Sequence, residues 1–168
     1  HAGLTLDELF ETIKKLEVIN IRLDEDDDPQ LIFESLNSTG LDLSEADKIR
    51  NYLLMSLAPA EQDDLYTRYW NPIEEFTKYD PSSFVRDYLT MKQGKIGRID
   101  KIYFIFKEYA EAINIDRATL LEDMHHYAKI YSQVDSAMIG TDKLNRKLNQ
   151  LRTLDSTIAY PFFMAFFD

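Results

Sequence analysis

Apolar side chains recur every three or four residues along most of the chain, and this spacing predicts a mainly α-helical fold. The first example follows Thr5, where Thr5-Leu6-Asp7-Glu8 has the spacing of a capping box. The stripe that follows this cap consists of Leu6, Leu9, Phe10, Ile13 and Leu16. The sequence therefore predicts an amphipathic helix near the start of the chain.

Residues 18–23 are the best candidate for a β-strand, because apolar and polar side chains alternate there. An acidic run, residues 24–28, follows, and Pro29 favours a short helix after it. An EF-hand loop that began at Asp24 would need glycine where Pro29 stands and glutamate where Ser35 stands. We therefore interpret the run as a solvated acidic turn and not as a calcium site.

Three residues mark helix starts in the middle of the chain. Ser44 is expected to cap one helix, and Pro59 and Pro81 are expected to open two more, the last of them short. The loop 93–97, with two glycines, is the clearest internal boundary, so we divide the chain into residues 4–92 and residues 98–168. Three longer helical patterns follow the loop. The expected fold is a multi-helix, bundle-like domain with a short β segment near its start.

Composition supports this class and narrows the kind of protein. The five glycines and five prolines are few for a sandwich or barrel, and 45% hydrophobic residues are enough for a folded core. The absence of cysteine excludes disulfides and thiolate metal sites. The longest apolar run, residues 158–167, is about half of a membrane span. We expect a soluble cytoplasmic protein with no membrane partner, and both termini suggest a segment of a longer protein.

The formal net charge of −11 disfavours binding of free nucleic acid, because an acidic surface repels phosphates. Two basic clusters nevertheless stand out, one around the glycines of loop 93–97 and one on the last helical pattern. Their candidate contacts with DNA phosphates are Lys95, Arg98, Arg146 and Lys147. The alternative is a solvated surface with ordinary ion pairs, and this alternative stays open.

The histidines and aromatic residues are interpreted as structural. His125 and His126 are adjacent, so on a helix their side chains point about 100° apart and do not easily share one metal ion, although Glu122 is one turn from His126 and can pair with it. The aromatic pairs at 103–104 and 162–163 occur at core spacings of helices. Base stacking needs exposed rings between basic residues, and the sequence does not suggest that arrangement.

Polar residues between 37 and 51 are harder to assign to structure alone. Gly40 is suited to end one helix and Ser44 to cap the next. Asp47, Arg50 and Asn51 then fall on one face of the second helix, because they are three and four residues apart. Two interpretations stay open: a hydrogen-bonded corner, or a contact with a nucleotide or another domain.

The same stretch carries a pattern of the form Phe-x-x-Leu-Asn-x-x-Gly-x-x-Leu-x-x-x-Asp, followed by a basic residue and asparagine. The matching positions are Phe33, Leu36, Asn37, Gly40, Leu43, Asp47, Lys48 and Asn51. This pattern resembles the family called domain of unknown function 262, the N-terminal part of GmrSD-type modification-dependent restriction systems. The close match covers about twenty residues, the length of this pattern.

The resemblance implies a longer protein with a ParB-like core, an Asp-Gly-Gln-Gln-Arg motif, nucleotide hydrolysis and, in many members, an HNH-type nuclease domain. Neither catalytic motif occurs in this chain. The chain would then be the non-catalytic helical segment between two missing domains, with no cofactor of its own. The residues implied to contact the core or its nucleoside triphosphate are Asn37, Ser38, Thr39, Gly40 and Asp47, supported by Arg50 and Asn51. The alternative is a stand-alone acidic, helical protein-interaction module.

Overall fold

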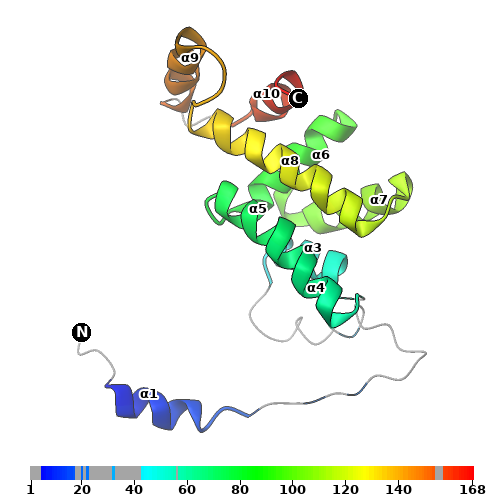
Figure 1. Cartoon of the computed structure of the whole chain (residues 1–168), viewed down its shortest axis with the longest axis vertical. Coiled ribbons are helices and arrows are strands. Elements are labelled where there is room, and N and C mark those ends of the chain that lie inside the picture. Colours follow the sequence, from blue (N-terminus) through cyan, green and yellow to red (C-terminus); the bar gives the residue numbers. More distant parts are fainter. Residues whose placement is uncertain are drawn as a thin grey trace.

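The structure is a computed structural model, and it describes residues 5–17, 20, 22, 32, 43–55, 57–153 and 157–168. The described part is mainly helical, as predicted (Figure 1). The helices are α1 Leu6–Ile13, α3 Glu45–Leu54, α4 Pro59–Leu65, the π-helical turn η1 Tyr66–Trp70, α5 Asn71–Phe76, α6 Pro81–Gln93, the 3-10 turn η2 Ile99–Lys101, α7 Ile102–Ile113, α8 Arg117–Asp135, α9 Asp142–Arg152 and α10 Tyr160–Phe166.

The described residues contain no strand. The predicted β segment at 18–23 is described only at Asn20 and Arg22, and neither lies in a strand. Residues 24–28 and Pro29 lie outside the described residues. The β part of the predicted fold class is therefore not found, whereas the helical part is confirmed.

Local sequence signals fix most helix starts. The Thr5 hydroxyl accepts a hydrogen bond from the backbone N–H of Glu8, and the Glu8 carboxylate accepts one from the N–H of Thr5, so the predicted capping box is present. Pro59 and Pro81 occupy the first positions of α4 and α6. Helix α6 is longer than predicted, with 13 residues, and ends where Gly94 adopts a φ of 68°.

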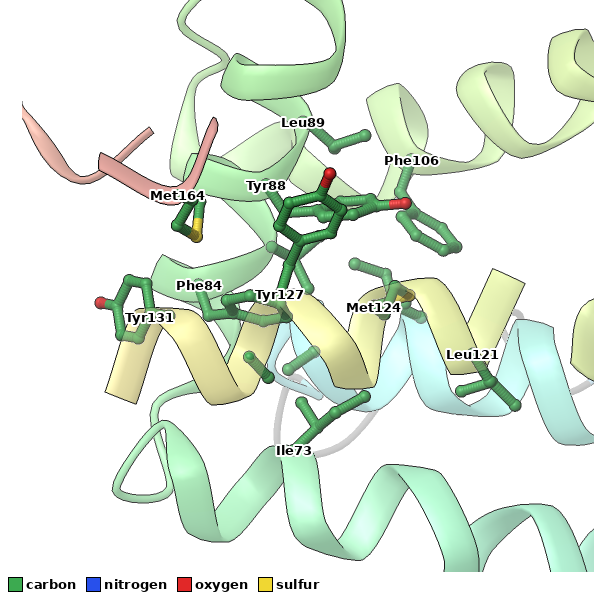
Figure 2. Close-up of a cluster of buried hydrophobic side chains, with 14 of the residues drawn as sticks. Ile73, Phe84, Tyr88, Leu89, Phe106, Leu121, Met124, Tyr127, Tyr131 and Met164 are labelled. Atoms are coloured by element: carbon green, nitrogen blue, oxygen red, sulfur yellow. The ribbon is translucent and has the colours of Figure 1, made fainter. Parts of the chain in front are cut away.

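One hydrophobic cluster joins the helices on both sides of loop 93–97. It runs from Ala46 in α3 to Met164 in α10. Helix α8 crosses the body of the molecule and packs against α3, α5, α6 and α10 (Figure 1). Figure 2 shows side chains of α5, α6, α7, α8 and α10 meeting there, among them Ile73, Tyr88 and Phe106. The core is continuous across this loop. The division of the chain there stays a prediction.

Several apolar positions predicted to share helical stripes are exposed. The whole stripe of α1 is exposed, up to 88% at Leu6, and in Figure 1 this helix lies apart from the others. Met138 and Ile158, which follow α8 and α9 in the sequence, are also exposed. Both lie beyond the ends of those helices, at Asp135 and Arg152, so their side chains leave the packed face.

Candidate functional site

The start of helix α3 holds three of the predicted site residues and is fixed first by its own cap. The Ser44 hydroxyl accepts a hydrogen bond from the backbone N–H of Asp47 at 3.1 Å and donates one to the Asp47 carboxylate at 2.7 Å. Ser44 therefore caps the helix as predicted, and it also orients the Asp47 side chain.

Asp47 is connected to the core through Arg50. The Arg50 guanidinium lies 2.9 Å from Asp47 Oδ1 and 3.3 Å from Glu74 Oε1 on α5. The same Glu74 oxygen accepts a hydrogen bond from Trp70 Nε1 at 2.7 Å, and Trp70 is fully buried. Since a buried indole N–H needs an acceptor, Glu74 satisfies the core ring and the arginine together.

Two further contacts fasten the first turn of α3 to other helices. The Glu45 carboxylate accepts a hydrogen bond from the backbone N–H of Tyr103 at 2.9 Å, at the start of α7. Its other oxygen lies 2.7 Å from Lys48 Nζ. The hydroxyl of Ser82, in the first turn of α6, accepts one from the N–H of Ala46 at 3.1 Å. The first N–H groups of a helix have no partner within the helix. Here a side chain of α3 accepts from one such group of α7, and a side chain of α6 accepts from one of α3.

We call this set the α3 junction. Its members are Ser44, Glu45, Ala46, Asp47, Arg50, Trp70, Glu74, Ser82 and Tyr103. Through it, the first two turns of α3 contact α5, α6 and α7 by hydrogen bonds or ion pairs. The sequence separations of these contacts, 24, 36 and 58 residues, explain why residue spacing alone did not reveal them.

A hollow of about 340 Å³ opens beside the junction, between α3 and α4. It is lined by Arg50, Asn51, Leu54, Pro59, Gln62, Asp63 and Tyr66. Among the residues that the structure describes, none makes a hydrogen bond with the Asn51 amide. Arg50 already contacts two carboxylates, so the hollow suits a neutral polar ligand better than a phosphate.

The predicted nucleotide-binding residues thus divide into two groups. Asn37, Ser38, Thr39 and Gly40 lie outside the described residues, so their roles stay predictions. Asp47, Arg50 and Asn51 lie on α3, where Asp47 and Arg50 contact each other and Arg50 and Asn51 line one hollow. The hydrogen-bonded corner, one of the two interpretations left open, describes Asp47 and Arg50 well.

The predicted DNA contacts lie on separate elements. Lys95 and Arg98 occupy the segment between α6 and η2, where Arg98 is paired with Asp100 at 2.8 Å. Arg146 and Lys147 lie on α9. Whether these four cations act on one ligand stays a prediction.

The prediction that the aromatic pairs are core residues is wrong for one ring of each pair. Tyr103 is buried, but Phe104 is 63% exposed, and Phe162 on α10 is 64% exposed. Phe104 lies in a hollow of about 420 Å³ beside α7, which we call the Phe104 hollow. It is lined by Ile96, Gly97, Arg98, Lys101, Phe104, Ile105, Lys107, Glu108 and Glu111.

The arrangement that the sequence did not suggest, an exposed ring between basic residues, is therefore present at Phe104. The signal that could have revealed it is Lys101-x-x-Phe104-x-x-Lys107, since a spacing of three keeps neighbouring side chains close on a helix.

His126 pairs with a different partner from the one predicted. Its Nε2 atom lies 2.8 Å from an oxygen of Asp168, and the other Asp168 oxygen accepts a hydrogen bond from the Tyr127 hydroxyl, also at 2.8 Å. The expected pair with Glu122 is not found. In the described ranges, no three His, Asp or Glu side chains gather in a way that suits a metal ion.

Comparisons with protein-family models, curated proteins and solved structures found no match to this chain. None of the described helices combines the length and apolar character needed to cross a membrane. The function is therefore inferred from the geometry above and from the resemblance of residues 33–54.

Proposed function

We propose that this chain is the non-catalytic helical segment of a GmrSD-like, nucleotide-dependent DNA restriction protein of the cytoplasm. In this proposal it couples a ParB-like core to a nuclease domain, and its partners are those domains and, through them, DNA. The sequence pattern between Phe33 and Asn51 supports the family assignment. The nucleoside triphosphate would bind the core, with the Asn-Ser-Thr-Gly segment of this chain closing on it.

The α3 junction is the observation that carries the coupling role. Helix α3 begins at Glu45, five residues after Gly40, and its first two turns contact α5, α6 and α7. A ligand shifts a structural equilibrium only if it binds the two states with different affinity. A displacement of α3 would be passed to three helices at once, because each is bonded to it directly.

The test uses the full-length protein that contains this segment and the substitution Arg50→Met. The variant should keep nucleotide hydrolysis but lose phage restriction by roughly 5–150-fold, the range of ordinary coupling free energies. Arg68→Met is the matched control, because Arg68 pairs with Asp64 at the surface of the same region. A thermal melt of each variant confirms folding.

Two outcomes would overturn the proposal. If folded Arg50→Met protein restricts phage as well as the wild type, the junction does not couple the domains. If hydrolysis and restriction fall in equal proportion, the arginine serves the reaction itself and not the connection.

A second candidate, an acidic protein-interaction module, is favoured by the aromatic face of α10. Phe162 and Phe166 stack with their ring centroids 6.0 Å apart, and both are about two-thirds exposed. Exposed aromatic rings are common anchors of protein interfaces. Phe162→Ala with Phe166→Ala should then abolish capture of a basic partner, whereas Arg50→Met should not affect it.

A further inference from the structure

Phe104 is an exposed ring on a helix that has a well-formed buried face. Ile102, Tyr103 and Phe106 of α7 are buried, but the Phe104 ring, which contacts Tyr103 at a centroid distance of 5.3 Å, is 63% exposed. Its neighbour across the hollow, Ile96, is 78% exposed. Single exposed apolar side chains are normal, but two that line one hollow form a surface that a ligand can cover.

The backbone of the preceding loop is held close to this helix. A Cβ atom added to Gly97 would lie 3.0 Å from the Ile105 side chain and 3.2 Å from that of Ile102. Glycine therefore lets the loop approach α7 closely. The approach brings Ile96 and Arg98 to the same hollow as Phe104.

The cations around this ring are the second observation. Elsewhere on the helical body some cations, such as Lys48 and Lys92, pair with carboxylates, whereas others, such as Lys129, form no ion pair with a described residue. Within the described ranges, Lys101 and Lys107 form no ion pair, although both line the Phe104 hollow. Lys107 Nζ lies over the Tyr52 ring, 5.9 Å from its centroid, so it is Lys101 beside the exposed ring that favours an anion with an aromatic or apolar part.

The acidic residues of the hollow limit where the negative groups of that ligand can lie. Glu108 and Glu111 lie four and seven residues after Phe104 on α7, or roughly 6 and 10 Å along the helix axis. They repel phosphates at that end, whereas Lys101 attracts them at the other, where Arg98 shares its charge with Asp100. The binding surface therefore has a positive and a negative end, with the ring between them.

We propose that the Phe104 hollow binds a short stretch of single-stranded nucleic acid, with an unpaired base stacked on Phe104. The adjoining phosphates contact Lys101 and, in competition with Asp100, Arg98. Stacking on one ring requires an unpaired base, and basic side chains beside an aromatic ring are the usual means of holding single strands. A duplex, whose bases are paired, would gain only the phosphate contacts and would meet the repulsion of the acidic chain. The inference does not depend on the proposed coupling role.

The experiment measures fluorescence anisotropy of three labelled probes at low salt with the whole chain: a short oligothymidylate, an abasic strand of equal length, and a duplex. We expect the oligothymidylate to bind best. Phe104→Ala should weaken its binding roughly 5–150-fold, the range for loss of one stacked base, and should leave the abasic strand unaffected. Lys101→Gln should weaken the binding of both strands. It should also reduce the slope of the logarithm of the binding constant against the logarithm of the salt concentration by roughly 1, as expected for the loss of one phosphate contact.

Phe162→Ala is the matched control, because Phe162 is as exposed as Phe104 but lies on α10. Its binding should equal that of the wild type. Three results would overturn the inference: no binding of the oligothymidylate at low salt, equal binding of oligothymidylate and abasic strand, or tighter binding of an acidic peptide than of any strand. The last result would assign the hollow to a protein partner.

Discussion

The α3 junction and the Phe104 hollow are neighbours in the structure but differ in how their charges are satisfied. At the junction, Arg50 bridges two carboxylates and Glu74 also accepts from a buried indole. In the hollow, Lys101 and Lys107 line a surface around an exposed ring, without an ion pair in the described part of the chain. The two regions meet at consecutive residues, since Tyr103 bonds to Glu45 and Phe104 faces solvent.

This difference separates two uses of polar residues. Polar groups that satisfy each other stabilise the fold, and removing one leaves its partner unpaired at a cost of about 1–3 kcal/mol. Polar groups that face solvent contribute little to folding and remain available to a ligand. Substitutions in the two regions should therefore affect different measurements: stability at the junction, and binding at the hollow.

The largest contrast should come from the two aromatic rings. Trp70→Ala removes a fully buried side chain and should lower the free energy of unfolding by about 3–5 kcal/mol. Phe104→Ala removes an exposed one and should change it by no more than about 0.5 kcal/mol. Urea denaturation followed by circular dichroism measures both. A large loss of stability in Phe104→Ala would mean that the ring belongs to the core and not to a binding surface.

Asp87 provides an intermediate case, in which a buried carboxylate is only half satisfied. It is 3% exposed, and its Oδ1 atom accepts two hydrogen bonds from Arg86, while Oδ2 has no partner in the part of the chain that the structure describes. Burial raises the pKa of Asp87 from 3.8 to about 6, against the opposing effect of Arg86. Between pH 4 and pH 6 the folded state then holds a proton that the unfolded state has lost.

It follows that Asp87 lowers stability as the pH rises through this window. One pKa unit corresponds to about 1.4 kcal/mol, so the free energy of unfolding falls by about 3 kcal/mol in all, and this loss is complete above pH 6. Asp87→Asn cannot ionise, so the difference in stability between variant and wild type should move in favour of the variant from pH 4 to pH 7. Urea titrations at both pH values test this. A difference that does not change with pH would mean that Asp87 titrates as an ordinary surface carboxylate.

Glu74→Ala tests the junction itself. The substitution leaves the buried Trp70 N–H without its acceptor and Arg50 with one carboxylate, and it should cost about 1–3 kcal/mol. Glu74→Gln keeps an acceptor oxygen and should cost less. Glu108→Ala, at an exposed position on α7, is the matched control and should be nearly neutral. Equal effects of Glu74→Ala and Glu108→Ala would remove the distinction between the two regions.

Sequence patterns predicted the local parts of this architecture well. The caps at Thr5 and Ser44 and the helix starts at Pro59 and Pro81 depend on residues within one turn, so they can be read directly. Periodicity also bears on the exposure of Phe104. Ile102 and Phe106 are four residues apart and nearly share one direction on a helix, whereas Phe104 lies about 200° from each, on the opposite face.

The contacts of the junction could not be predicted in the same way. A hydrophobic stripe tells which face of a helix is buried, but not which helix covers it. The bond between Glu45 and the Tyr103 N–H joins residues 58 positions apart, and the pair of Arg50 with Glu74 joins residues 24 apart. Such contacts depend on the arrangement of all the helices, so the sequence suggested the face that contains Asp47 and Arg50 but not its partners.

The smallest expected effect concerns the two glutamates of the Phe104 hollow. If phosphates contact Lys101 and Arg98, Glu108 and Glu111 weaken binding by repulsion from the other end of the hollow. Glu108→Gln with Glu111→Gln should then strengthen oligothymidylate binding by roughly 2–5-fold at low salt, as expected for exposed charges worth up to about 1 kcal/mol. The gain should shrink as salt rises, because exposed charges are screened beyond about 10 Å at 0.1 M salt. Stability should not change, since both side chains are exposed.

A control pair, Glu61→Gln with Asp63→Asn on α4, removes the same charge away from the hollow. If the control pair strengthens binding equally, the effect comes from net charge alone and the strand is not held beside Phe104.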